Sequence, residues 1–229
     1  MTFDEYADDY DAHVQSALPK WGVDHSRILG AKADHLVAIM ERALPGSLCP
    51  RILDVGCGIG SMARHLSGSR RRLIGVDPAV RALVRARREC PATDFSAFDG
   101  VDIPFADRAF DAVFAASVLH HVNPDRRRRL LEEVKRVTRA DGLVMILEHN
   151  PRNPLTRRVV SRCEFDRDAI LVEADEACDL LRQVGLQRVG RIFTLFTPWR
   201  GRLWGWIDAM LRDLPLGGQY IAFGRRSEP

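Results

Sequence analysis

Three glycines at alternate positions, Gly56, Gly58 and Gly60, follow a short apolar run that contains a carboxylate, Asp54. Glycines at such a turn let backbone N–H groups approach a ligand closely. A glycine loop that opens a helix usually holds a phosphate group. Asp54 would repel a phosphate. We therefore interpret the loop as a binding element for a ligand of a different kind.

Two further acids end neighbouring predicted strands. Asp77 ends the strand predicted over 71–77, and Asp99 ends the weaker one over 93–99. An acid after the second strand of such a series commonly accepts hydrogen bonds from ribose hydroxyls. Open α/β sheets bind ligands at the carboxyl edge of their strands, where all these acids fall. For Asp99, a simple cap of the strand end is the alternative interpretation.

Residues able to take a proton follow the next two predicted strands. His120 and His121 come after the fourth strand, and Glu148 and His149 end the fifth. Histidine titrates near neutral pH, which suits a general base. We prefer His149 for this role, with His120 and His121 as the other catalytic candidates. The alternative, of equal weight for each residue, is that they shape a pocket or make structural hydrogen bonds.

Strand and helix patterns alternate over the part of the chain that carries these residues, which predicts βαβ units and a parallel sheet covered on both faces. The predicted strands are 51–55, 71–77, 93–99, 110–118 and 142–150, with helices over 61–67, 79–89 and 124–138. Helices over 4–18 and 26–43 precede them. After Pro151 we predict a helix over 174–185, a strand over 186–196, a tryptophan-bearing amphipathic helix over 198–215 and a closing strand over 218–226.

Composition is ordinary for a globular protein of 229 residues, with 46% hydrophobic residues and a net charge of +3. Five scattered cysteines without a CxxC pair predict reduced thiols, and no His/Cys cluster has ligand spacing, so no metal site is predicted.

No apolar run is long enough for a membrane span. The acidic N-terminus does not resemble a signal peptide, which points to the cytoplasm.

Four stretches in this order resemble the class I S-adenosylmethionine-dependent methyltransferases: LDVGCGIG, GVDP, FDGVDIPFADRAFDAVFAASVLHHV and EVKRVTRADGLVMILEHN. They are most similar to the small-molecule branch that includes quinone-biosynthesis C-methyltransferases. The resemblance covers 51–150 in register. It implies a Rossmann-like α/β domain over 46–229, with seven strands in the order 3-2-1-4-5-7-6 and an antiparallel last strand. An N-terminal helical lid over 1–45 would precede it.

This resemblance implies S-adenosylmethionine as the ligand of the glycine loop. It has no phosphate and carries an ammonium and a sulfonium cation, so a neighbouring carboxylate is favourable. Asp54 would support the methionine amino group, Asp77 would bind the ribose hydroxyls, and Asp99 with Gly100 would bind the adenine. The implied cofactor-binding residues are Tyr10, Asp54, Gly56, Cys57, Gly58, Gly60, Asp77, Pro78, Asp99, Gly100 and Ser117. A NAD-binding loop is the alternative, but it would prefer GxGxxG.

The implied reaction transfers a methyl group to a small-molecule acceptor and leaves S-adenosylhomocysteine. One alternative is a cofactor-binding fold that works as a non-methylating cyclase or accessory protein. Another is an RNA or protein methyltransferase. The near-neutral charge and the lack of an Asn-Pro-Pro-Tyr-type motif weigh against amino-group methylation of nucleobases, and the basic run 125–129 is interpreted as a solvated helix face. We expect no nucleic-acid partner.

Two segments are predicted to lie on the acceptor side, about 148–172 and 198–215. Arginines of the first could meet an anionic acceptor or be exposed. Tryptophans of the second could select an apolar acceptor, with core packing as the alternative, and this helix could also rest on a membrane surface. Tyr10 is expected to close over the cofactor, unless it is a fixed core residue. The oligomeric state is not predicted.

Overall fold

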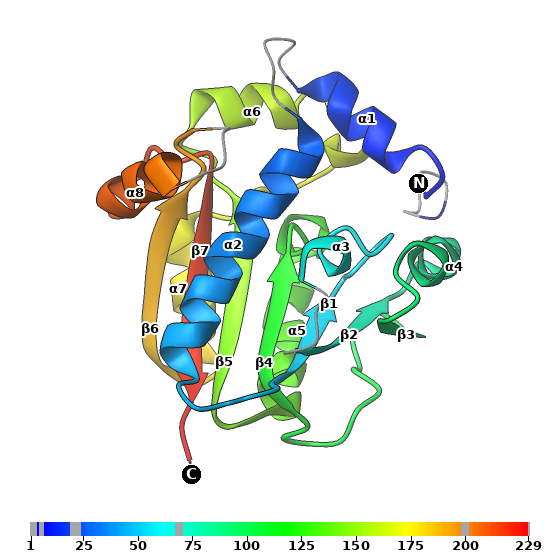
Figure 1. Cartoon of the computed structure of the whole chain (residues 1–229), viewed down its shortest axis with the longest axis vertical. Helices are drawn as coiled ribbons and strands as arrows, with labels where there is room; N and C mark the ends of the chain where they lie inside the picture. The colour runs from blue at the N-terminus through cyan, green and yellow to red at the C-terminus, as the bar shows by residue number, and fades with distance from the viewer. Residues whose placement is uncertain (1–3, 5–6, 19–23, 67–70, 198–201, 229) are drawn as a thin grey trace.

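The fold is built on one seven-stranded sheet, in a computed structural model that describes residues 4, 7–18, 24–66, 71–197 and 202–228 (Figure 1). The strand order is β3-β2-β1-β4-β5-β7-β6, and β7 is antiparallel to both of its neighbours. This confirms the predicted class I methyltransferase topology. The strands are β1 (Arg51–Val55), β2 (Arg72–Asp77), β3 (Asp94–Ala97), β4 (Phe110–Ala116), β5 (Thr138–His149), β6 (Leu186–Thr194) and β7 (Gln219–Arg226).

Helices cover both faces of this sheet, which explains why the central strands are buried along nearly their whole length. The helices are α1 (Tyr10–Ala17), α2 (His25–Ala43), α3 (Ala63–Leu66), α4 (Val80–Glu89), α5 (Pro124–Val137), α6 (Pro154–Val160), α7 (Ala174–Gln183) and α8 (Arg202–Leu211). In β1, Ile52 belongs to the same buried cluster as Leu36 of α2, whereas the next residue, Leu53, belongs to the cluster that contains Leu131 of α5. Alternate side chains of a strand point to opposite faces, so both can be apolar only when both faces are covered.

Two helices lie over the carboxyl ends of the parallel strands. α1 and α6 lie beside one another at one end of the molecule, above β4 and β5 (Figure 1). α6 was not predicted as a helix. Its signals are local, because Asn153 accepts the backbone N–H of Thr156 as N-cap and Pro154 occupies the first helical turn. α1 is shorter than the helix predicted over 4–18, and begins at Tyr10.

No helix in the described part of the chain combines the length and the hydropathy that crossing a membrane requires. The exposed side of α8 is nonetheless apolar, since Leu203, Trp206 and Met210 are each exposed by 60% or more.

Candidate functional site

The glycine loop borders a cavity of about 260 Å³ at the carboxyl ends of β1, β2 and β4, which we call the glycine-loop cavity. Most of the residues expected to contact the cofactor line it. These are Tyr10, Asp54, Gly56, Cys57, Gly58, Asp77, Pro78, Gly100 and Ser117. The arrangement brings together residues of α1, the first two parallel strands and the loop after β4.

Loop geometry explains two of the glycines. Gly56 has φ +74°, and a Cβ atom there would lie 2.5 Å from Cγ2 of Val118. Gly60 has φ +77°, and its Cβ would lie 3.3 Å from both Ala86 and Phe95. Both conformations are ones that side-chain-bearing residues rarely adopt. Gly60 therefore lets the loop pack closely on α4 and β3, and it does not line the cavity.

Asp77 ties the glycine loop to the loop that follows β2. Its Oδ2 accepts the backbone N–H of Gly58 at 2.7 Å, and its Oδ1 accepts that of Ala79 at 2.8 Å. Burial raises the pKa of Asp77 against the effect of these two hydrogen bonds. A carboxylate oxygen can accept a second hydrogen bond, so Asp77 can hold the loop and still face a ligand.

Asp54 presents a buried acceptor to the glycine-loop cavity. Its side chain is 2% exposed, and within the described residues its Oδ2 atom has no hydrogen-bond partner. Burial and the neighbouring charge of Asp77 raise its pKa well above the ordinary value. A buried acceptor without a partner is costly, and a cationic ligand would relieve the cost. The site therefore fits the ammonium group of S-adenosylmethionine and does not fit a phosphate.

Asp99 is placed differently from its expected role at the adenine. It is exposed, and its Oδ1 accepts the backbone N–H groups of Val101 at 2.9 Å and Asp102 at 2.7 Å. The carboxylate thus caps its own loop, which was the alternative interpretation. Gly100 and Phe98 line the cavity in its place.

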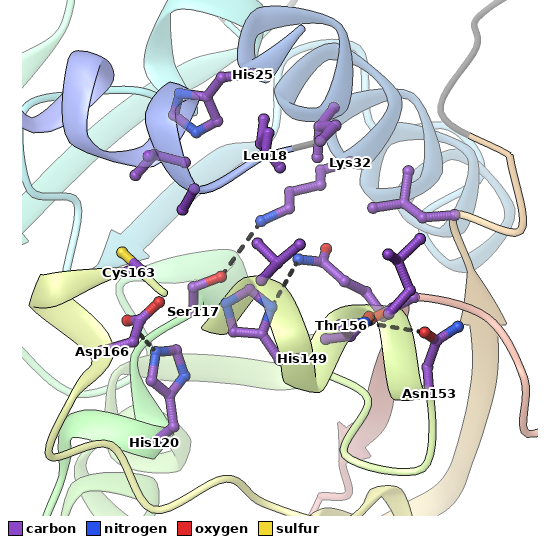
Figure 2. Close-up of a pocket in the computed structure, with 18 of the residues that line it drawn as sticks. Leu18, His25, Lys32, Ser117, His120, His149, Asn153, Thr156, Cys163 and Asp166 are labelled. Carbon is purple, nitrogen blue, oxygen red and sulfur yellow. Dashed lines mark hydrogen bonds and ion pairs between the residues drawn. The ribbon is translucent and has the colours of Figure 1, made fainter. Parts of the chain in front are cut away.

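A second cavity of about 240 Å³ adjoins the first, and we call it the α1/α6 cavity (Figure 2). Its walls include apolar side chains of α1 and α6, such as Val14 and Val159. Six residues line both cavities: Tyr10, His25, Lys32, Ser117, His121 and Phe165. A ligand in one cavity would therefore be separated from a ligand in the other by little more than these side chains.

Lys32 is a buried cation in this shared wall. It is 8% exposed, and its Nζ donates to Ser117 Oγ at 3.3 Å (Figure 2). Burial lowers its pKa from 10.5 to about 8, although the charges of Glu148 and Asp166 oppose the change. Sequence reasoning missed Lys32. A signal was present, because it follows Leu29 by one helical turn and so falls on the buried face of α2.

His149, the preferred base, lines the α1/α6 cavity but is poorly suited to accept a proton. Burial, with the positive charges of His120 and Lys32, lowers its pKa to about 3. Its Nδ1 lies 3.4 Å from Nε2 of Gln219. An imidazole with this pKa is neutral at pH 7 and is a weak base, so its environment favours a hydrogen-bonding role.

His120 lies in a buried polar cluster. Its Nδ1 lies 2.5 Å from Oε2 of Glu148, whose Oε1 accepts the backbone N–H groups of Val118 and Leu119 at 2.9 and 2.7 Å. Burial opposes protonation of His120, but the charges of Glu148 and Asp166 and their interactions with the imidazole together outweigh it and raise the pKa to about 9.

Asp166 joins both histidines of the pair that follows β4. Its Oδ1 lies 3.5 Å from Nε2 of His120 and 3.2 Å from Nε2 of His121. Sequence analysis did not identify Asp166, because it lies more than 40 residues after the two histidines, in a short 3₁₀ turn over Glu164–Asp166. Sequence spacing predicted no cluster of metal ligands. In the described part of the chain, however, His120, His121 and Asp166 place potential ligand atoms within 4.8 Å of one another.

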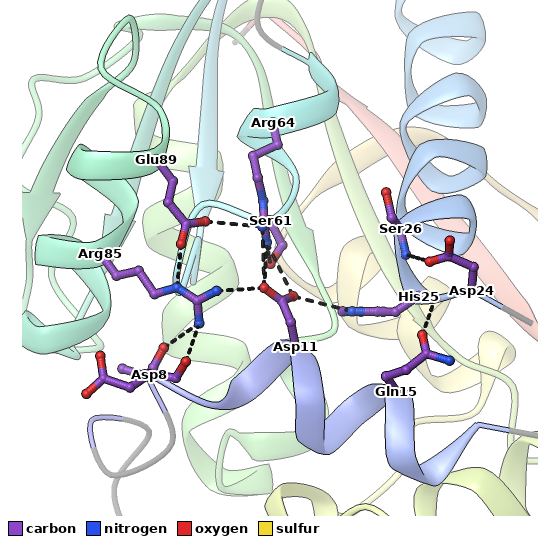
Figure 3. Close-up of polar contacts among 11 residues, drawn as sticks. Asp8, Asp11, Gln15, Asp24, His25, Ser26, Ser61, Arg64, Arg85 and Glu89 are labelled. Carbon is purple, nitrogen blue, oxygen red and sulfur yellow. Dashed lines mark hydrogen bonds and ion pairs between the residues drawn. The ribbon is translucent and has the colours of Figure 1, made fainter.

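α1 is held over the glycine loop by a charged network (Figure 3). Asp11 of α1 pairs with Arg85 of α4 at 2.7 Å, with Arg64 of α3 at 3.3 Å and with His25 of α2 at 3.4 Å. Tyr10, on the same turn, makes edge-on ring contacts with Phe165 and His25 at centroid distances of 5.8 and 6.1 Å. These contacts place Tyr10 at the boundary of the two cavities.

The two segments predicted for the acceptor side differ in what they contribute. The segment 148–172 lines the α1/α6 cavity through α6 and the turn after it, but Arg157, Arg158 and Arg162 are exposed and line neither cavity. In the segment 198–215, Trp206 is 60% exposed and Trp204 lines a separate cavity between α2 and α8. Trp204 and Trp206 thus line neither the glycine-loop cavity nor the α1/α6 cavity, and Trp199 lies outside the described residues.

Comparison with known proteins agrees with this geometry. Residues 53–146 match the family model described as a methyltransferase domain. A demethylmenaquinone methyltransferase of Renibacterium salmoninarum is 29% identical over 150 residues, which is 64% of this chain and 61% of that protein. A probable tRNA methyltransferase 9B of Homo sapiens is 34% identical over 109 residues, 47% of this chain and 22% of that protein. The matches thus span less than two thirds of either relative.

A solved structure with similar architecture is the S-adenosylmethionine-dependent methyltransferase, possible histamine N-methyltransferase, of Thermotoga maritima. It has a TM-score of 0.72 and 18% identity, and the match covers 98% of each chain. At this identity the likeness shows the fold alone. The fold and the glycine-loop cavity define a Rossmann-like domain of the methyltransferase class. Residues 53–146 match the methyltransferase-domain family, and the strand order is that of the class I S-adenosylmethionine-dependent methyltransferases, a class whose methyl donor is S-adenosylmethionine.

Proposed function

We propose that this protein transfers a methyl group from S-adenosylmethionine, held in the glycine-loop cavity, to a small molecule held in the α1/α6 cavity. The observation that carries the proposal is the shared wall of the two cavities, formed by residues such as Lys32 and Ser117. When bound, S-adenosylmethionine supplies a methyl group that is already activated on a sulfonium. The protein's main contribution is then to align the two reactants, which can supply about 10⁵–10⁸ M of effective molarity.

Different residues of the glycine-loop cavity would bind different parts of S-adenosylmethionine. Asp54 would accept hydrogen bonds from the ammonium through its unpartnered Oδ2, and Asp77 would keep the loop in place while facing the ribose. Gly56 lets the loop pack against Val118, which lines the same cavity. Tyr10 would close the cavity from α1, in a helical lid that the Asp11 network holds in position.

The α1/α6 cavity favours a small acceptor with an apolar body and an oxygen-bearing end. Leu18, Val159 and Phe165 provide apolar walls, and Lys32 provides a buried cation at the shared wall. An acceptor oxygen that has lost its proton would be stabilised beside this ammonium. Neutral His149 would orient the acceptor by a hydrogen bond. The walls formed by α1 and α6 leave less room for a nucleotide within a folded RNA than for a free small molecule.

Two measurements test this function. Calorimetry with S-adenosylmethionine should give binding to the wild type and weakened binding to Asp54→Asn. A screen of small phenols, hydroxy acids and quinols should yield S-adenosylhomocysteine and a methylated product. Binding without any methylated product over a broad screen would favour the non-methylating cyclase or accessory role. Methylation of RNA that excludes small acceptors would favour the kind of activity named for the tRNA methyltransferase relative.

A further inference from the structure

Three side chains that line the α1/α6 cavity have the geometry of metal ligands. Asp166 Oδ1 lies 3.2 Å from Nε2 of His121 and 3.5 Å from Nε2 of His120, and the ligand atoms all lie within 4.8 Å of one another. An ion bound by nitrogen and oxygen at about 2.0–2.2 Å in a tetrahedral site separates its ligand atoms by roughly 3.4 Å. The observed separations bracket that value.

His120 has a buried nitrogen that is oriented but unpartnered. Its side chain is 1% exposed, and among the described residues its Nε2 makes no hydrogen bond, because the 3.5 Å approach of Asp166 is too long for a good one. Its Nδ1 faces Glu148 at 2.5 Å, and Glu148 is itself held by two backbone N–H groups. A carboxylate on the far nitrogen is the usual support for a metal-binding histidine, since it fixes the ring and the tautomer.

We propose that His120, His121 and Asp166 bind one divalent first-row transition-metal ion, such as Zn²⁺, Mn²⁺ or Fe²⁺. Two imidazoles and one carboxylate suit such ions better than Mg²⁺ or Ca²⁺, which prefer oxygen ligands. Asp166 and Glu148 provide negative charge that offsets the ion's charge. Three protein ligands leave coordination positions open, as in catalytic metal sites.

The open positions would face the acceptor. All three ligands line the α1/α6 cavity, and His121 also lines the glycine-loop cavity. The ion would there bind an acceptor oxygen and, as a Lewis acid, favour loss of the hydroxyl proton to water, which leaves the deprotonated oxygen next to the methyl donor. The acceptor class is therefore a molecule that offers a hydroxyl or carbonyl oxygen to the metal. This assignment of the acceptor rests on the proposed function, whereas the metal site itself does not.

Metal binding can be measured without any methyl transfer. The full chain, stripped with a chelator and then freed of it, is titrated with Co²⁺, whose visible absorption reports nitrogen coordination, and Zn²⁺ is then added as competitor. We expect one Co²⁺ per chain, displaced by one Zn²⁺. A Cys49→Ser background removes the exposed thiol as an adventitious ligand.

Matched variants locate the site. His121→Ala and Asp166→Ala should each lower Co²⁺ affinity at least tenfold, and Glu148→Gln should lower it about ten- to a hundredfold by misorienting His120. His149→Ala removes another histidine of the same cavity and should leave the affinity unchanged. His121 is partly exposed, so its variant is expected to fold, and retained binding of S-adenosylmethionine verifies this for every variant.

Two results would overturn the metal site. One is the absence of stoichiometric Co²⁺ and Zn²⁺ binding by the wild type, which would leave His120, His121 and Asp166 as a metal-free polar cluster. The other is equal Co²⁺ affinity in Asp166→Ala and His149→Ala. Because these readouts need no acceptor, failure of the metal site is distinct from failure of the methyltransferase function. Once an acceptor is found, chelation that leaves its methylation unchanged would refute the Lewis-acid role alone.

Discussion

Lys32 should make the stability of this protein depend on alkaline pH. Burial lowers its pKa from 10.5 to about 8, so between these values the unfolded state binds a proton that the folded state has released. Stability contributed by this group therefore rises with pH through that window. Below pH 8 Lys32 is charged in both states, so the folded state carries the full cost of the buried ammonium. Above pH 10.5 Lys32 is neutral in both states.

The size of the effect follows from the two pKa values. A lowering from 10.5 to about 8 corresponds to a penalty of about 3 kcal/mol at neutral pH. At pH 9 the Lys32 side chain is protonated in nearly every unfolded chain but in only about one folded chain in ten. The free energy of unfolding therefore rises by about 1.2 kcal/mol per pH unit at this pH. Lys32 is 8% exposed, so solvent screens this penalty little.

Lys32→Met isolates this contribution from other groups that titrate at high pH. Free energies of unfolding in urea should be measured between pH 7 and 10 for both proteins, with a chelator present and no S-adenosylmethionine. The wild type should gain roughly 2 kcal/mol relative to the variant across this range. Parallel pH profiles would refute the argument, because they would mean that Lys32 is not a buried, destabilised cation in the folded state.

Three further predictions concern the glycine loop, the lid and the acceptor side. Asp77→Ala should weaken S-adenosylmethionine binding roughly ten- to a hundredfold in calorimetry and also lower the thermal midpoint, because the carboxylate holds Gly58 and Ala79; unchanged affinity would refute the ribose role. Binding of S-adenosylmethionine should increase the hydrogen-exchange protection of residues 7–18. Arg85→Ala should reduce that protection, because it removes the 2.7 Å ion pair with Asp11. Equal protection with and without the ligand would favour a fixed Tyr10. Trp206→Ala should leave both S-adenosylmethionine affinity and acceptor KM unchanged, since this side chain is 60% exposed, and a raised KM would contradict its placement.

Much of the fold could be predicted from the sequence because its signals are local. Each buried strand is a short apolar run between turn residues, and β1, β2, β4 and β7 begin and end within about two residues of their predicted bounds. The glycine loop is equally local, since Gly56 and Gly60 adopt backbone conformations that other residues avoid. The order of the strands was not encoded in any one segment, and came from the resemblance of several motifs to a known family.

Only the tertiary structure decided which side chains meet. Lys32 of α2 reaches Ser117 after β4, and Asp166 of a short turn reaches His121, although neither pair is close in sequence. The same packing left Trp206 in solvent. Backbone propensities act over a few residues, whereas proximity across elements depends on how helices dock on the sheet. The sequence by itself therefore determined the strands and the glycine loop. The packing of the turn Glu164–Asp166 against the ends of β4 and β5 determined the polar cluster, and the docking of α1, α2 and α6 determined the cavity beside it.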